Sequence, residues 1–314
     1  MSHHVVFGTG QIGTHVAGQL IESGADVVVV SRSGRAVPTG ARALNGDLTD
    51  AEFAATAAKG AAVIYFCLNA PSYRSWPEQF PPLQRAAMHA AFVTGARLVV
   101  LENLYSYGPT GGRTLTEDLP AHATSAKART RIEMTDELLE AHHRGTLDVT
   151  IGRASDFFGP RVTQSALGDQ VIRPALTGER AQVMGDPGKR HSYSYAPDVA
   201  TGLIALGTAQ AASGEIWHLP IAETLTTREF IDAIYTAAGH PTRLTAAGRT
   251  ALAVVGLVKP ELKELRHTLY QFTEDWVVDD TKFRTTFGDL STPLTTAIES
   301  TVHWYRTATT RESS

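Results

Sequence analysis

The stretch that decides the predicted fold is Val5-Val6-Phe7-Gly8-Thr9-Gly10-Gln11-Ile12-Gly13, close to the amino terminus. Its three leading apolar residues predict a buried strand, the third glycine leads into a helical pattern, and a second apolar run follows at Val27–Val30. A dinucleotide-binding turn is found in this context, where a strand is followed by a glycine-rich turn, a helix and a further strand. The chain therefore begins with a predicted nucleotide-binding unit.

Each residue of this turn has an expected task. Gly8 permits the tight turn, Gly10 leaves room for a pyrophosphate beside the backbone, and Gly13 lets the helix pack close to the sheet. Gln11 and Ile12 belong to the amino terminus of the helix, where free N–H groups and a partial positive charge attract phosphate. These five residues form the expected pyrophosphate site.

The composition is that of a globular protein and gives no sign of a nucleic-acid or membrane partner. The chain has 314 residues, of which 43% are hydrophobic, and carries a net charge of −4 without a basic stripe. The longest apolar stretch, Ala251–Val258, is too short to span a bilayer, and the amino terminus has no signal-peptide pattern. The single cysteine, Cys67, excludes an internal disulfide framework, and no histidine or cysteine spacing predicts a metal site. We expect a cytoplasmic protein that acts on a small molecule.

Short apolar runs alternate with helical patterns through the first half of the chain. The runs that predict buried strands are Val5–Phe7, Val27–Val30, Val63–Leu68, Leu98–Leu101 and Leu147–Ile151. The patterns that predict helices between them are Gln11–Ser23, Ala51–Lys59, Pro81–Thr94 and His122–His143. This alternation predicts an α/β fold with a doubly wound parallel sheet, the Rossmann arrangement. The less regular second half predicts a smaller α/β region after the break at Phe158-Gly159-Pro160.

The end of the second predicted strand bears on the choice of nucleotide. A carboxylate at this point accepts hydrogen bonds from the adenine ribose and selects NAD, but Ser31 and Arg32 stand there instead. Arg32 can pair with a 2′-phosphate that a carboxylate would repel, so NADP(H) is favoured over NAD(H), unless Arg32 is an ordinary solvated cation. Asp47 could accept a hydrogen bond from the adenine amino group, or it could simply belong to a turn. Both alternatives stay open.

Seven motifs follow one another along the chain: Gly8–Gly13, Gly46-Asp47-Leu48, Asn69-Ala70-Pro71, Glu102–Gly108, Thr116-Glu117-Asp118, Arg153–Pro160 and Tyr195–Ala200. In this order they resemble the motifs of the extended short-chain dehydrogenase/reductase family, which includes nucleotide-sugar epimerases, dehydratases and ketone reductases. The resemblance covers roughly residues 4 to 240.

The resemblance implies further roles and a division of the chain. Asp47 and Leu48 would contact adenine, and Asn69 would lie at the nicotinamide ribose. Residues 1–156 and 190–220 would form the dinucleotide-binding domain, and residues 157–189 and 221–314 a smaller substrate-binding region. Family members often pair through a four-helix interface, so we expect a homodimer formed by the helices predicted over residues 81–94 and 122–143.

The chain departs from the family at the catalytic tyrosine, which precedes a lysine by four residues. The matching lysine is Lys127, a candidate ribose contact, but Ala123 stands at the tyrosine position and cannot transfer a proton. Asn103 replaces the family's upstream serine, and its amide can still donate a hydrogen bond to a substrate oxygen. The candidate hydroxyls that could replace the tyrosine are Tyr73, Tyr105, Tyr107, Thr124 and Ser125.

Two functions are compatible with this departure. The first is an NADP(H)-dependent oxidoreductase or epimerase that acts on a carbonyl or hydroxyl carbon near Asn103 and Lys127, with another hydroxyl, the substrate or water supplying the proton. The second is a non-catalytic NAD(P)-binding redox sensor or regulator. We favour the enzyme because the substrate-side motifs are retained.

Two kinds of substrate also remain open. Arg161, Arg173, Arg190 and His191 could clamp a diphosphate, as cations do in sugar-nucleotide enzymes. Alternatively, aromatic side chains could line an apolar pocket for a hydrophobic ketone or aldehyde. These side chains are Tyr73, Trp76, Phe80, Phe157 and Phe158.

Overall fold

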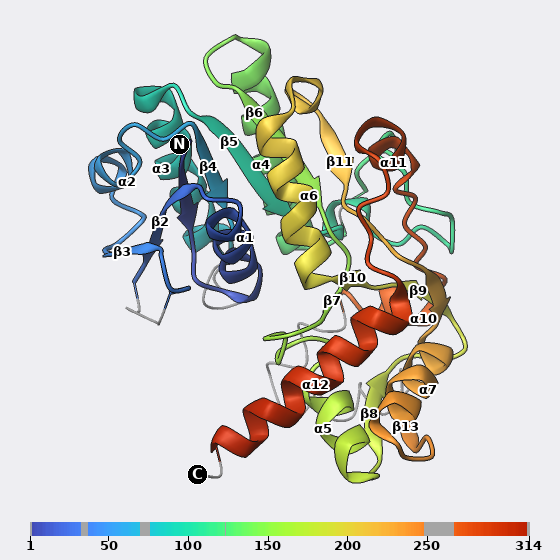
Figure 1. Ribbon diagram of the computed structural model, residues 1–314. Helices are drawn as coiled ribbons and strands as arrows, with labels where there is room; N and C mark the ends of the chain where they lie inside the picture. The colour runs from blue at the N-terminus through green and yellow to red at the C-terminus, as the bar shows by residue number, and fades with distance from the viewer. Residues whose placement is uncertain (1, 33–36, 70–75, 123, 248–266, 313–314) are drawn as a thin grey trace.

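The computed structural model describes residues 2–32, 37–69, 76–122, 124–247 and 267–312 (Figure 1). Its central sheet has seven parallel strands in the order β11-β6-β5-β4-β1-β2-β3. Their bounds are β1 (His3–Phe7), β2 (Asp26–Ser31), β3 (Arg42–Asn45), β4 (Val63–Phe66), β5 (Arg97–Glu102), β6 (Val149–Arg153) and β11 (Ile216–His218). The strand order reverses between β1 and β4, as in the predicted Rossmann arrangement.

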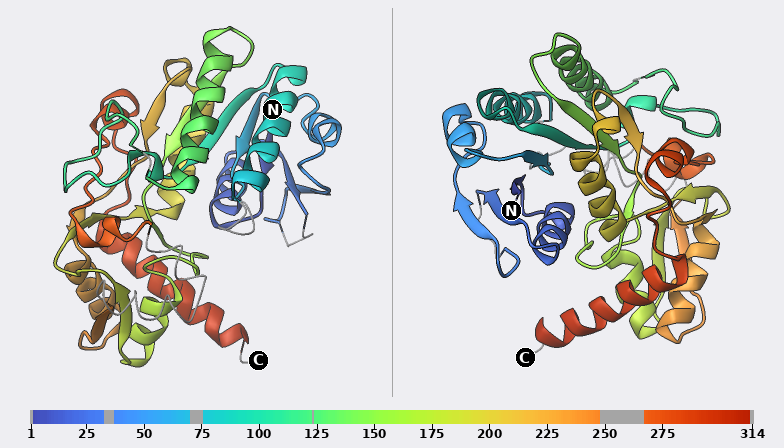
Figure 2. Two further views of the ribbon diagram at one scale, coloured as in Figure 1. Left: turned by 180° about the vertical axis from the view of Figure 1, so that it is seen from behind. Right: turned by 45° about the horizontal axis from the view of Figure 1, so that its top comes forward.

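Helices cover both faces of this sheet. On one face α1 (Gln11–Glu22) packs against α6 (Ala196–Thr208). On the other face α2 (Ala51–Ala57), α3 (Trp76–Thr94) and α4 (Ala126–His143) lie in a row, as the two views of Figure 2 show. Because both faces are covered, the valines of β1 and β2 are buried on either side, which explains why these strands are continuous apolar runs.

A smaller group of elements lies below the sheet in Figure 1 and has a hydrophobic core of its own. The group consists of α5 (Asp169–Thr177), β8 (Ala181–Met184), α7 (Thr227–Ala238), β13 (Leu244–Ala247) and α12 (Leu294–Glu312). β8 and β13 pair in parallel, and α7 begins with a capping box formed by Thr226 and Glu229. The predicted smaller α/β region is therefore present, while the residue limits of the two domains stay a prediction.

Short elements connect the two groups. β7 (Phe157–Phe158) pairs with β10 (Ser194–Tyr195), and β9 (Arg190–Ser192) pairs with β12 (Thr224–Thr226). The remaining short helices of the described residues are η2 (Tyr105–Tyr107), η3 (Gln210–Ala212), α10 (Tyr270–Thr273) and α11 (Thr281–Phe287).

Two predicted helices begin at other residues than expected. α3 begins at Trp76 rather than Pro81, and carries two prolines in its interior. These prolines remove amide donors, but the buried rings of Trp76 and Phe80, 5.3 Å apart, hold this part of the helix on the core. The helix predicted from His122 begins after Ser125, whose hydroxyl accepts a hydrogen bond from an amide of the first turn.

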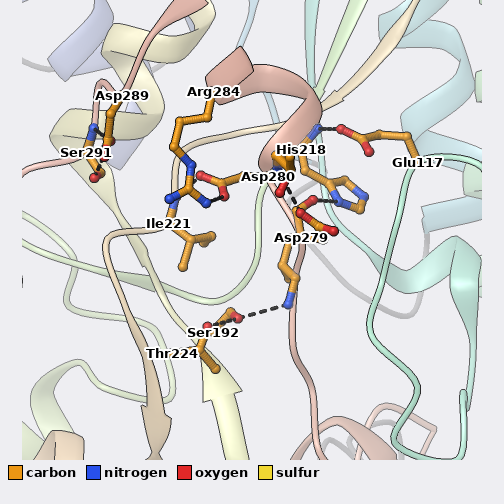
Figure 3. A network of polar contacts seen from close by, with 12 residues as sticks. Glu117, Ser192, His218, Ile221, Thr224, Asp279, Asp280, Arg284, Asp289 and Ser291 are labelled. Atoms are coloured by element: carbon orange, nitrogen blue, oxygen red, sulfur yellow. Dashed lines mark hydrogen bonds and ion pairs between the residues drawn. The ribbon is translucent and has the colours of Figure 1, made fainter. Parts of the chain in front are cut away.

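A buried polar network fastens the carboxyl-terminal part of the chain to the sheet (Figure 3). His218, at the end of β11, donates from Nδ1 to the carbonyl oxygen of Asp279 and accepts at Nε2 from the hydroxyl of Tyr107, each over 2.8 Å. The backbone amide of His218 donates to the carboxylate of Glu117 at 2.8 Å. One histidine thus joins three segments that are far apart in the sequence.

The residues that follow Asp279 continue this attachment. The Asp280 carboxylate accepts from the amide of Ile221 and pairs with Arg284 (Figure 3). Lys282 donates from Nζ to the carbonyl oxygen of Ile216 in β11 at 2.9 Å. Side chains of this segment therefore bond to backbone groups of β11 and of the residues just after it.

Burial lowers the pKa of His218 to about 4, so the folded protein holds this ring neutral. In the unfolded chain the ring titrates near its ordinary value of 6.5. Between these two values the unfolded state binds a proton that the folded state does not bind, so acid favours unfolding.

We expect the free energy of unfolding to fall as the pH drops from 6.5 to 4, with His218 contributing up to about 3 kcal/mol. Urea unfolding at pH 7, 5.5 and 4.5 measures this. His218→Gln should be less stable at pH 7 and should lose less stability on acidification, whereas His143→Gln, at an exposed position, should keep the wild-type slope. An unchanged slope in His218→Gln would contradict the assignment.

Candidate functional site

The candidate site lies at the carboxyl edge of the central sheet, where the strand order reverses between β1 and β4. β1 ends at Phe7 directly before the glycine turn, β4 ends at Phe66, and β5 ends at Glu102 directly before Asn103. Because all these strands are parallel, their ends and the loops after them face the same side. Ligands of open α/β sheets bind in this position.

The three glycines of the turn differ in their surroundings. Gly8 has a φ of +113°, which favours glycine, and a Cβ atom at Gly13 would lie only 2.1 Å from the carbonyl oxygen of Gly8. At Gly10, by contrast, a Cβ atom would meet nothing within 4 Å. Gly8 and Gly13 therefore bring the turn and the helix together, and Gly10 faces open space that a phosphate could occupy.

The amino terminus of α1 is arranged to receive an anion. Gly10 is its cap residue, and no side chain caps the helix within the described part of the chain. The first turn contains no acidic residue, so the partial positive charge of the helix end is not neutralised there. The amides of Gln11 and Ile12 lie in this turn, which fits a pyrophosphate.

The end of β2 combines a cation and a carboxylate. Ser31 is buried and its carbonyl oxygen accepts from the amide of Gly46 at 3.2 Å, while Arg32 is exposed. The Asp47 carboxylate accepts from the amide of Thr49 at 3.0 Å, which lowers the pKa of Asp47, and the charge of Arg32 lowers this pKa further. Arg32 and Asp47 therefore share one edge of the site.

Other expected cofactor contacts differ in their exposure. Leu48 is buried and belongs to the hydrophobic core. Asn69, shortly after β4, is exposed at the carboxyl edge of the sheet. Tyr73 and Ala123 lie outside the described residues.

Asn103 and Lys127 lie on neighbouring elements. The Asn103 Oδ1 atom accepts from the amide of Tyr105 at 3.0 Å, which starts the short helix η2. Lys127 is buried in the first turn of α4, and α4 packs against η2. Because Oδ1 can only accept, the amide NH₂ of Asn103 is the group that can donate to a ligand.

The two tyrosines of η2 point into different surroundings. Tyr105 is half-buried and stacks on Trp76, with ring centroids 6.0 Å apart. Tyr107 is buried, donates its hydroxyl to His218 and lies under the guanidinium of Arg153, and burial raises its pKa. Tyr107 therefore belongs to the structural network, whereas Tyr105 remains the candidate hydroxyl of this helix.

Two buried cations beside the site were not singled out by the sequence. Arg131 lies four residues after Lys127 on the same face of α4, with its guanidinium 4.2 Å from the ring centre of Phe80. Arg153 pairs with Glu102 at 3.2 Å across β5 and β6, and Thr135 donates to the same carboxylate. The spacing of Lys127 and Arg131 could have indicated the first of these.

The residues proposed for substrate binding differ in their exposure. His191 is buried, and Arg173 pairs with Asp169, so neither presents an unpaired cation, while Arg161 and Arg190 are exposed. The aromatic residues Trp76, Phe80 and Phe158 belong to the core.

Within the described residues, no helix has both the length and the apolar character that crossing a bilayer requires. The same part of the chain contains no group of three or more His, Cys, Asp or Glu side chains that could hold a metal ion.

A pair of glycine variants tests the assignment of the turn. Gly10→Ala should leave the free energy of unfolding within about 0.5 kcal/mol of the wild type and weaken nicotinamide nucleotide binding at least about tenfold, because its methyl group enters the open space. Gly13→Ala should cost about 1–3 kcal/mol of stability, because its methyl group meets the carbonyl oxygen of Gly8. Urea unfolding and calorimetric titration measure the two effects. Wild-type nucleotide affinity in Gly10→Ala would show that the phosphate lies elsewhere.

The comparisons with known proteins agree with the fold and with the position of the glycine turn. The model of the NAD-dependent epimerase/dehydratase family matches residues 5–219, from β1 to the end of β11, which confirms the resemblance to extended short-chain dehydrogenases/reductases. A dTDP-glucose 4,6-dehydratase from Streptomyces griseus is 28% identical over 134 residues, and this match spans 42% of the chain and 40% of that protein's length.

Solved structures extend the similarity over nearly the whole chain. A dTDP-glucose 4,6-dehydratase from Streptomyces venezuelae, with NAD and TYD bound, has a TM-score of 0.77 at 22% identity and covers 97% of both chains. A UDP-glucose 4-epimerase from Thermotoga maritima, with UDP-glucose, has a TM-score of 0.80 at 16% identity, over 98% of this chain and 99% of the other. These identities show a shared fold. With the family match covering more than half of the sequence, the chain belongs to the NAD-dependent epimerase/dehydratase family.

Proposed function

We propose that this protein is an NADP(H)-dependent epimerase, dehydratase or related oxidoreductase that acts on a hydroxyl or carbonyl carbon of a sugar nucleotide. The observation that carries the proposal is the open space at Gly10 in front of α1, which no side chain of the described residues caps, on the same edge of the sheet as Asn103 and Lys127. The sugar-nucleotide part is supported by the relatives, whose names and bound ligands are of this class.

The residues present fit a nicotinamide dinucleotide. The amides of Gln11 and Ile12 would bind the pyrophosphate, and Gly10 gives it access to the backbone. Lys127 would hold the nicotinamide ribose, and Asn69 would lie beside it. A bound nicotinamide supplies the hydride acceptor and donor of the reaction.

Asn103 is the group that we assign to the substrate oxygen. Its Oδ1 atom accepts a hydrogen bond from the amide of Tyr105, which orients the side chain, and its NH₂ group is the donor that we assign to the ligand. Hydrogen bonding to an oxygen that gains negative charge stabilises the transition state. Ala123 cannot move the proton, so the proton must pass to another hydroxyl, to the substrate or to water.

Asn103→Asp should lower kcat about 100-fold, since aspartate keeps the acceptor for the Tyr105 amide but loses the donor. The free energy of unfolding should stay close to that of the wild type in Asn103→Asp and should fall in Asn103→Ala, which loses both functions. Steady-state kinetics with a turned-over sugar nucleotide and urea unfolding separate the two effects. A kcat in Asn103→Asp equal to that of the wild type would remove Asn103 from the reaction.

The preference for NADP(H) rests on Arg32. Its exposed guanidinium, at the end of β2, can pair with a 2′-phosphate, whereas the nearby Asp47 carboxylate would favour the unphosphorylated ribose of NAD. We weigh Arg32 more heavily because Asp47 is already engaged with the amide of Thr49.

Calorimetric titration should show tighter binding of NADPH than of NADH. Arg32→Ala should weaken NADPH binding about tenfold and leave NADH binding within about twofold, because only NADPH carries the 2′-phosphate. Arg129→Ala, which removes an exposed cation from α4, is the matched control and should change neither. Tighter binding of NADH by the wild type would reverse the cofactor assignment and point to Asp47.

Turnover distinguishes the enzyme from the redox-sensing regulator. The protein, incubated with NADP⁺ or NADPH and a panel of sugar nucleotides, should convert one of these sugar nucleotides. Absorbance at the nicotinamide band and product analysis measure the conversion. Nucleotide binding with no conversion across the panel would favour the regulator. Family membership supports the enzyme.

The proposal also includes a cytoplasmic homodimer. α3 and α4 pack side by side on one face of the sheet, and the end of α3 exposes Phe92 and Val93. Exposed apolar side chains of this size favour association with a partner surface.

A further inference from the structure

A buried carboxylate stands in the chain directly before Asn103. Glu102 is the last residue of β5, and its side chain is 1% exposed. Arg153, the last residue of β6, donates from Nε to the Oε2 atom of this carboxylate at 3.2 Å. From the other side, the hydroxyl of Thr135 in α4 lies 2.8 Å from Oε1. The carboxylate therefore joins the ends of two neighbouring strands to α4.

Several contacts hold the carboxylate on the side of the sheet. Glu102 and Arg153 are register partners in the β5–β6 ladder, and the carbonyl oxygen of Glu102 accepts from the amide of Ala154 at 2.9 Å. The guanidinium of Arg153 also lies 5.0 Å from the ring centre of Tyr107, whose hydroxyl bonds to His218. Glu102 is thus a fixed acceptor against which α4 can be placed.

Apolar packing does little to fix the first two turns of α4. The buried side chains of these turns are small or polar, namely Lys127, Ala128, Thr130 and Arg131. The large apolar side chains that α4 buries, Met134 and Leu138, lie further along the helix and belong to the core. Apolar contacts are also non-directional, whereas a hydrogen bond to a charged group requires one geometry. The position of the first turns therefore depends on polar contacts.

Thr135 is the residue of α4 that makes the polar contact with the sheet. Lys127, Arg131 and Thr135 are spaced by four residues, so they follow one side of the helix. The Thr135 hydroxyl has one hydrogen, and a bond to a carboxylate is stronger than one to the carbonyl oxygen of Arg131, 2.9 Å away. The hydroxyl therefore donates to Glu102, and this bond sets where α4 lies along β5.

We infer that Glu102 is a positioning residue, whose bond to Thr135 fixes the place of Lys127 at the carboxyl edge of the sheet. The inference rests on the proposed function, in which Lys127 holds the nicotinamide ribose. A buried ion pair such as that of Glu102 and Arg153 contributes little net stability, because the lost hydration offsets the attraction. What the carboxylate adds is a directional bond that selects one position of α4.

Thr135 is the position at which the inference is tested, because Glu102→Gln would leave the buried charge of Arg153 unpaired and destabilise the fold. Calorimetric titration of the full-length protein compares NADPH with 2′,5′-ADP, which lacks the nicotinamide ribose. Thr135→Val should weaken NADPH binding about fivefold and leave 2′,5′-ADP binding within about twofold. Thr135→Ser, which keeps the hydroxyl, should retain the wild-type ratio of the two affinities. NADH and ADP form a second pair of probes, which keeps the readout if the cofactor preference is reversed.

Thr130→Val is the matched control on the same helix. Thr130 is buried like Thr135, but its hydroxyl donates to the carbonyl oxygen of Ala126 at 3.0 Å, within α4. This variant also removes a buried hydroxyl and its contact with a helix carbonyl, yet it should leave the ratio of the two affinities unchanged. A change of ratio as large as that in Thr135→Val would overturn the positioning role.

A double variant tests whether Thr135 acts through Lys127. Lys127→Met should itself weaken the binding of NADPH and spare that of 2′,5′-ADP. Adding Thr135→Val to Lys127→Met should then cause no further loss of NADPH affinity, because the group that Thr135 positions is gone, whereas independent effects multiply. Multiplied losses would overturn the positioning role.

The outcomes separate this inference from the proposed function. If the wild type binds neither NADPH nor NADH, the proposed function fails and the positioning role fails with it. If a nicotinamide nucleotide binds, but Thr135→Val changes the affinities for it and for its fragment equally or changes neither, only the positioning role is overturned.

Discussion

The close approach between Gly13 and the carbonyl oxygen of Gly8 is the contact on which the rest of the site depends. A side chain at position 13 would force α1 away from the end of β1, because its Cβ atom would lie 2.1 Å from that oxygen. With hydrogen in its place, the first turn of α1 lies directly above the edge where β1, β4 and β5 end. The strand order reverses at the same point, so the helix amides, Asn103 and the start of α4 are brought to one region.

Local signals accounted for most of the central sheet. The runs Val27–Val30 and Val63–Leu68 predicted strands correctly because both faces of the sheet are covered and each residue must be apolar. The starts of α3 and α4 were predicted wrongly, because the prediction used only the residues around each start. In the structure, Trp76 and Phe80 hold the first part of α3 through contacts with the core. The small paired strands β7 and β10 were not predicted, since two residues carry no periodicity.

Residues of the candidate site could be predicted only at positions where the backbone conformation or the available space requires one residue type. Glycine positions are selected by space and by φ, so Gly8, Gly10 and Gly13 could be assigned from their order alone. The sequence allows His191 as one of several cations for a diphosphate, whereas the structure buries it between two aromatic rings and against Asp156. Such a role depends on residues 35 and 80 positions away in the chain, which no local pattern connects.

The attachment of the carboxyl-terminal segment to β11 has a consequence for how copies of this protein behave in solution. A strand at the margin of a sheet normally offers unpaired amides and carbonyls that can recruit a strand from another molecule. In β11 the amide of His218 is occupied by Glu117 and the carbonyl of Ile216 by Lys282, and the same lysine lies 4.3 Å from the ring centre of Trp217. Charged side chains thus occupy backbone groups at this edge of the sheet and disfavour edge-to-edge aggregation there.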